Sequence, residues 1–171
     1  MALALDFTFD ASTYRHYMNG FLTVLHCHHY MCLYTKTAEQ FQDCGGVEIL
    51  QETAEDSIRP IFDDYFVKHQ VTDPAARLQI CANFYAAMGL GCMEVTGTSA
   101  AGTATLKASH VDQGWIKKWG KRDQPVNYFT CGYLNAAFAA AFGRPARSFA
   151  SREESSMVSG NGFSRFAITQ R

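Results

Sequence analysis

The sequence lacks several patterns that identify large functional classes. No two of its six cysteines have C-x-x-C spacing, so we expect no zinc ribbon or finger. No G-x-S-x-G motif marks a hydrolase nucleophile. No apolar run approaches the roughly 20 residues of a membrane helix. The opening MALALDFTF has neither the basic region nor the long apolar stretch of a signal peptide. We therefore expect a cytoplasmic protein with reduced thiols and no membrane span.

Charge is scarce as well. Charged residues make up 18% of the chain and the net charge is −1, whereas 47% of the residues are apolar and 13% aromatic. This balance gives no electrostatic basis for binding nucleic acid, and it argues against disorder. A chain of 171 residues suits a single domain over residues 1–171. The surplus of apolar side chains favours a lined cavity or a subunit interface.

The first half of the chain, residues 1–90, is predicted to be mainly helical. Residues 11–43 are expected to form one long helix, capped by Asp10 or Ser12 and ended by Gly45-Gly46. A second helix over 47–69 would be kinked or split at Pro60, and a third would open at Asp73-Pro74 and stop at Gly89 or Gly91. The stripe that supports the first helix recurs at three- and four-residue steps and consists of Tyr14, Met18, Phe21, Leu25, His28 and Cys32.

The second half, residues 91–171, is predicted to contain a β-hairpin, a helix and a second hairpin. The short β-leaning segments 92–97 and 102–109 form the first hairpin, and 147–153 and 162–169 form the second. Between the hairpins lie a short helix capped by Asp112 and an apolar helix over 125–142. Neighbouring strands of this kind pair antiparallel. The predicted fold class is therefore α+β, with N-terminal helices packed on an antiparallel sheet and a further apolar helix.

One cluster of residues carries donors for several kinds of chemistry. His26-Cys27-His28-His29 is followed by Cys32, and imidazole and thiolate are good ligands for zinc or haem iron. One helix face offers two of these side chains, so His110 or His69 would have to complete a metal site. Three interpretations stay open: core and surface contacts, a polar role in ligand binding, and a metal site. Ser109, His110 and Asp112 lie so close in sequence that a catalytic triad, which such trios rarely form, is not expected.

The stretch from residue 125 to residue 166 resembles a known family. PVNYFTCGY (125–133) leads into a helix, FGRP (142–145) follows it, and Ser148-Phe149, Glu153, Gly160 and FSRF (163–166) come after. This order is similar to the C-terminal half of the 4-vinyl-reductase-like domain, also called hydrocarbon-binding. That family includes the aromatic-sensing domains of phenol- and xylene-responsive activators. It shares its fold with a subunit family of vesicle-tethering complexes, and a weaker similarity links the chain to amino-thiazoline-carboxylate hydrolase-like proteins.

The chain departs from the metal site of this family. Many members bind a structural zinc, and the resemblance places its ligands at Asn127, Glu153, Ser156 and Ser164. Three of these are serine or asparagine, which are poor zinc ligands, so we expect no zinc and no other cofactor. Instead the four residues are expected to form a polar cluster, in which the Ser156 and Ser164 hydroxyls donate to Glu153.

The resemblance implies a binding module for a small apolar or aromatic molecule, acting as a stand-alone sensor or carrier and forming a homodimer through the first helix. The alternative is a small hydrolase or reductase that uses the His/Cys cluster of that helix. One histidine would serve as the polar handle of an otherwise apolar pocket. The residues expected to bind the ligand are Phe21, Leu25, His28, His29, Cys32, Trp115 and Tyr133.

Overall fold

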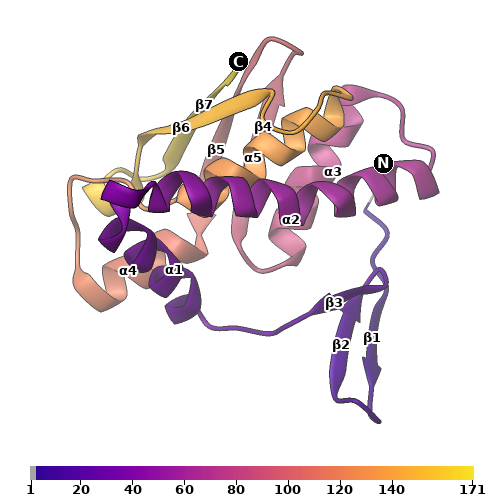
Figure 1. Ribbon diagram of the computed structural model, residues 1–171, viewed down its shortest axis with the longest axis horizontal. Coiled ribbons are helices and arrows are strands. Elements are labelled where there is room, and N and C mark those ends of the chain that lie inside the picture. Colours follow the sequence, from indigo (N-terminus) through magenta and orange to yellow (C-terminus); the bar gives the residue numbers. More distant parts are fainter. Residues whose placement is uncertain (1–2) are drawn as a thin grey trace.

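The computed structural model describes residues 3–171, and Figure 1 shows how its elements are arranged. The helices are α1 (His28–Gln40), α2 (Gly46–Lys68), α3 (Pro74–Ala87), α4 (His110–Trp119) and α5 (Tyr128–Ala141), with 3-10 turns η1 (Gln42–Cys44) and η2 (Met157–Ser159). The strands are β1 (Phe7–Asp10), β2 (Arg15–Met18), β3 (Phe21–Thr23), β4 (Gly91–Gly97), β5 (Ala101–Ser109), β6 (Phe149–Ser155) and β7 (Ser164–Gln170). Across residues 3–171, no helix combines the length and apolar character that crossing a membrane requires.

The main sheet has the strand order β4-β5-β7-β6, and all its pairs are antiparallel. The predicted α+β class is confirmed, as are both C-terminal hairpins and the apolar helix between them. The third helix also begins as predicted. The Asp73 carboxylate accepts the Ala76 N–H at 2.8 Å, and Pro74 occupies the first helical position.

Helix α5 lies at the centre of the fold, because every residue from Thr130 to Ala141 is buried. It packs between the main sheet and α2, which runs beside it (Figure 1). The two helices cross so closely that a Cβ on Gly132 would collide with the backbone oxygen of Gln51. A glycine is therefore required where α5 meets α2.

The prediction of one long helix over residues 11–43 is wrong. Residues 7–23 form a separate three-stranded antiparallel sheet, and α1 begins only at His28. Asn19 and Gly20 both have positive φ and form the two-residue turn of a β-hairpin, which a helix cannot accommodate. The Asp10 carboxylate accepts hydrogen bonds from the Ser12 and Thr13 hydroxyls in the turn between β1 and β2, so it does not cap a helix. The apolar stripe that suggested one helix is thereby divided between a turn, two strands, a linker and α1.

Two smaller expectations also need correction. Pro60 does not split its helix, because α2 continues through it from Gly46 to Lys68. Asp112 does not cap α4; that role belongs to Ser109, whose hydroxyl accepts the Asp112 N–H at 3.1 Å. The Asp112 side chain is thereby directed into the protein interior, where it is fully buried.

Asp112 is the centre of a buried polar network. One carboxylate oxygen accepts hydrogen bonds from the Ser156 hydroxyl at 3.0 Å and the Val158 N–H at 3.3 Å. The other accepts from the Asn127 amide at 2.7 Å and the Ser164 hydroxyl at 3.1 Å. Charge-assisted hydrogen bonds of this kind are stronger than neutral ones. The network therefore connects α4 to the start of α5 and to both strands of the second hairpin at its loop end.

Asn127 joins Glu153 to the same network. Its backbone N–H and side-chain amide donate to the two Glu153 oxygens at 3.1 and 2.8 Å. The two serine hydroxyls, expected to donate to Glu153, donate instead to Asp112. Burial first, and then the negative charge of Asp112, raise the pKa of Glu153, and the hydrogen bonds from Asn127 oppose this rise.

The substitution Gly132→Ala should destabilise the protein by about 1–3 kcal/mol, because α5 and α2 must separate to accept the new methyl group. Urea denaturation followed by circular dichroism measures this loss. The matched control is Gly162→Ala, where an added Cβ meets no atom within 4 Å. Equal stability of the two variants would contradict the close crossing.

A comparison of the wild type with Glu153→Gln should reveal the raised pKa of Glu153, because the difference in stability between the two proteins should depend on pH. The fold favours the neutral Glu153 carboxyl, so this stabilisation is complete below the ordinary pKa of 4.5 and is lost as pH rises through the folded-state pKa. The wild type should therefore lose stability relative to the variant as pH increases above 4.5, by about 1.4 kcal/mol for each unit of pKa difference. Urea denaturation at a series of pH values checks this, and a pH-independent difference would contradict it.

Candidate functional site

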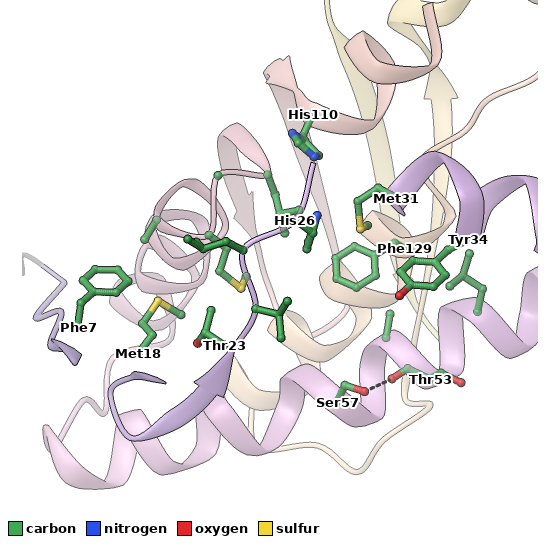
Figure 2. A pocket seen from close by; sticks show the side chains of 18 residues that line it. Phe7, Met18, Thr23, His26, Met31, Tyr34, Thr53, Ser57, His110 and Phe129 are labelled. Carbon is green, nitrogen blue, oxygen red and sulfur yellow. Dashed lines mark hydrogen bonds between the residues drawn. The ribbon is translucent and has the colours of Figure 1, made fainter. Parts of the chain in front are cut away.

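A large cavity lies between the N-terminal sheet and the helices. Its volume is about 520 Å³, within the range of small-molecule sites, and its wall is mostly apolar (Figure 2). One part of the wall comes from the N-terminal segment: Phe7, Met18, Thr23, Val24, Leu25 and His26. The other part comes from the rest of the chain: Met31, Tyr34, Leu50, Thr53, Ala54, Ser57, Ala87, Met88, Gly89, Leu90, His110 and Phe129.

The polar side chains of this cavity include a histidine pair at one end, a Thr/Ser pair at the other, and the hydroxyls of Thr23 and Tyr34 elsewhere in the wall. Figure 2 shows His26 and His110 next to each other at one end, and Thr53 and Ser57 of α2 at the other. The Ser57 hydroxyl already donates to the Thr53 backbone oxygen at 2.8 Å. No acidic side chain lines the cavity. The histidine end is therefore the place where a mainly apolar ligand finds a titratable partner.

His28 and His29 lie beside the two histidines at this end. The ring centroids of His26 and His110 are 5.8 Å apart, those of His28 and His110 5.9 Å, and those of His28 and His29 4.3 Å. Burial, followed by His26 and His28, lowers the pKa of His110, and burial followed by His29, Lys117 and Lys118 lowers that of His28. Both groups favour the neutral imidazole. Across residues 3–171, no group of three or more His, Cys, Asp or Glu side chains is arranged to hold a metal ion.

The hydrogen bonding of His26 defines what it can offer a ligand. Its Nδ1 lies 3.3 Å from the Cys27 backbone oxygen. A carbonyl oxygen only accepts, so Nδ1 carries the hydrogen of this bond. In the neutral ring Nε2 is then an acceptor. This arrangement suits a ligand that brings a hydroxyl or another hydrogen-bond donor.

The residues expected to bind a ligand lie in different places. Leu25 lines the large cavity, and Phe21 lines a second cavity of about 320 Å³ between the Asn19-Gly20 end of the N-terminal sheet and the helices α2 and α3. His28 contacts His110 but is not part of the cavity wall, and the His29 Nδ1 lies 3.4 Å from the exposed Cys27 Sγ. Their role in ligand binding stays a prediction.

The other three expected residues are packed into the interior. Cys32 is fully buried with its Sγ 3.9 Å from the Val111 oxygen, and burial raises its pKa. Trp115 lies under the Arg122 guanidinium at 4.1 Å, and the Tyr133 hydroxyl donates to the Cys81 oxygen at 2.6 Å. The hydrolase or reductase alternative requires His29, His110 and Cys32 to share one cleft. Among the described residues, these three side chains do not share one.

Sequence reasoning missed most of the cavity wall. His26 and His110 were noted as candidates for a metal site, a polar ligand contact or a catalytic cluster but were not among the residues expected to bind the ligand, and Thr53 and Ala87 carried no signal at all. These positions come together only because residues 7–26 fold back over α2 and the end of α3 (Figure 2). The Asn19-Gly20 turn was the one local signal that could have revealed this arrangement.

Comparison with known proteins shows similarity in structure but not in sequence. No family model matches the chain, and no curated protein matches its sequence. The phenol-responsive sensory domain of the transcription activator PoxR, solved with phenol, superposes with a TM-score of 0.78 at 12% identity, over 96% of this chain and 84% of that one. A trafficking protein particle complex subunit 3 from Naegleria fowleri, covalently bound to palmitic acid, gives 0.52 at 11% identity, over 84% of this chain and 94% of that one. The chain therefore has the fold of these sensory and trafficking proteins.

Proposed function

We propose that this protein binds a small, mainly apolar molecule in the large cavity, as a sensor or carrier. The observation that carries the proposal is the cavity itself, with about 520 Å³ of mostly apolar space and two histidines at one end. Burial of apolar surface would supply most of the affinity, and a hydrogen bond to a histidine would set the orientation. The two structural neighbours support this class of ligand, since one was solved with phenol and the other with palmitic acid.

The ligand that fits best carries a hydrogen-bond donor on an apolar body. With the Nδ1 hydrogen on the Cys27 backbone oxygen, an uncharged His26 ring would present Nε2 as an acceptor at one end of the cavity. A single phenol ring would fill only part of the space, so an alkyl-substituted phenol suits the volume better. Resemblance to the 4-vinyl-reductase-like domains points to the same chemistry, and we place the chain with them on this basis.

The binding prediction is that 4-butylphenol stabilises the wild type against heat more than phenol does. A ligand that binds only the folded state raises its stability according to its affinity, and the butyl chain adds buried apolar surface. Leu25→Asp, which brings a charge to the cavity wall, should weaken binding at least about tenfold. His26→Ala should reduce the binding free energy of 4-butylphenol by about 1–3 kcal/mol, whereas His29→Ala should leave the affinity unchanged. Thermal shift and calorimetry measure these effects.

The matched control for Leu25→Asp is Val67→Asp, because both side chains are 80% exposed and only Leu25 lines a cavity. The binding site is located elsewhere if these two variants bind 4-butylphenol equally well. The proposal fails altogether if no apolar compound stabilises the wild type. An equal loss of affinity in His26→Ala and His29→Ala would indicate that the histidines of α1 also contribute to the polar contact with the ligand.

We also propose that the protein is a homodimer through α1. Tyr30, Leu33 and Tyr34 are each at least half exposed on this helix, and Phe41 follows them. Their spacing places the first three on one face, and a twofold interface needs only one such self-complementary face. An apolar face of this kind is typical of subunit contacts.

The dimer prediction is tested by light scattering at tens of micromolar protein. The wild type should show twice the mass of one chain, and Leu33→Asp should show the mass of one chain, because a charge at a buried interface has no partner there. Val67→Asp controls for an added surface charge. A wild type that stays monomeric at this concentration would contradict the proposal.

A further inference from the structure

The N-terminal segment meets the rest of the protein across two cavities. We call residues 4–26 the arm and residues 28–171 the body. The cavity of about 520 Å³ lies between the arm and α1, α2, α3, α4 and α5, and the cavity of about 320 Å³ lies between the arm and α2 and α3. Well-packed parts of a protein leave little space of this kind between them. Two cavities therefore separate parts of the arm from the body.

Few direct contacts hold the arm in place. Among the described residues, the hydrogen bond from the Ala4 N–H to the Tyr65 hydroxyl, at 2.9 Å, is the only one that joins arm and body. Met18 is the single side chain of strands β1–β3 that is buried. Phe7, Phe9 and Leu22 are 52–61% exposed, and Figure 1 shows the small sheet standing apart from the helices.

A three-stranded sheet with one buried side chain has little stability of its own. Segments with few buried apolar contacts open locally, at a lower free energy than the whole fold requires. The apolar side chains with which the arm lines the large cavity stay exposed; Phe7, for example, is 61% exposed. An apolar molecule that fills the cavity buries apolar surface of the arm and of the body at once.

We propose that the arm is a strap that docks on the body when the large cavity is filled. This rests on the proposed function, because the natural filler would be the apolar ligand. Phe7, Met18 and Leu25 contact the ligand from the strap, and Leu50, Ala87 and Phe129 contact it from the body. Ligand binding would thereby reduce local opening of residues 7–26 far more than opening elsewhere. Through the strap, a ligand bound in the cavity would make the small surface sheet β1–β3 open less often.

Trypsin measures the opening directly, because Arg15 is the only lysine or arginine in residues 4–26. Arg15 pairs with Asp10 in the sheet, and a protease cuts only after the sheet opens. The rate at which the fragment 1–15 appears is followed by mass spectrometry in the whole folded chain. Ala87→Leu fills part of the cavity from the end of α3, and Ala86→Leu is the matched control, because Ala86 is exposed and lies outside the cavity wall.

We expect cleavage after Arg15 to precede any cleavage in the body. Ala87→Leu should slow it at least about fivefold, since it buries added methyl groups against the strap. Ala86→Leu should leave the rate unchanged, and saturating 4-butylphenol should slow it in the wild type. Thr53→Leu fills the same cavity from α2 and serves as a second variant if Ala87→Leu does not fold, which circular dichroism reports.

The strap is overturned if Arg15 is cut no faster than sites in the body, or if the cavity-filling variants and Ala86→Leu are cut at the same rate. It is also overturned if calorimetry shows that 4-butylphenol binds while the cleavage rate stays the same; the proposed function then survives. In a further outcome, Ala87→Leu slows cleavage after Arg15 but 4-butylphenol does not bind. In that case the strap stands, and the proposed ligand class is wrong.

Discussion

A mostly apolar cavity between two parts of one chain is the constraint on which the proposed function of this protein depends. Folding normally removes such space, because side chains beside a void lose both dispersion contacts and hydrophobic burial. Here the space persists between the N-terminal sheet and a well-packed body. The body can maintain a concave wall because its own stability comes from elsewhere, chiefly from the burial of α5 between the sheet and α2.

The buried network around Asp112 gives that body a fixed shape on the side where α4 begins. Asp112 receives four hydrogen bonds, and Asn127 ties Glu153 to it, so α4, α5 and the second hairpin are held together by polar contacts. His110 is two residues away from Asp112 on the first turn of α4. The histidine at the end of the cavity is therefore positioned by a network that does not itself touch the cavity.

The sequence predicted the elements whose signals are local. The Asp73-Pro74 cap, the small apolar residues of α5 and the alternating strands of both hairpins were all recognisable, because each pattern reflects its own backbone conformation. The N-terminal sheet was missed because Tyr14, Met18 and Phe21 also fit a helical spacing. The Asn19-Gly20 turn, which decides between the two interpretations, was given no weight.

The site was less predictable than the fold. The resemblance identified Asn127, Glu153, Ser156 and Ser164 as one cluster, but Asp112, which the two serines contact, comes from a helix outside the family motif. The cavity wall joins residues more than 100 positions apart, such as Phe7 and Phe129, and no local pattern encodes that meeting. His26 was recognisable in the sequence as part of the His/Cys cluster. Its position at the end of the cavity, however, depends on the path of the linker between β3 and α1.

Native mass spectrometry of the protein, after incubation with an apolar extract of its own host, tests the central claim most directly. The account predicts one small apolar molecule per chain, retained by the wild type and by Val67→Asp, released on denaturation and absent from Leu25→Asp. A wild type that carries no such molecule would contradict the account. So would a molecule retained equally by Leu25→Asp, because the cavity would then not be where it binds.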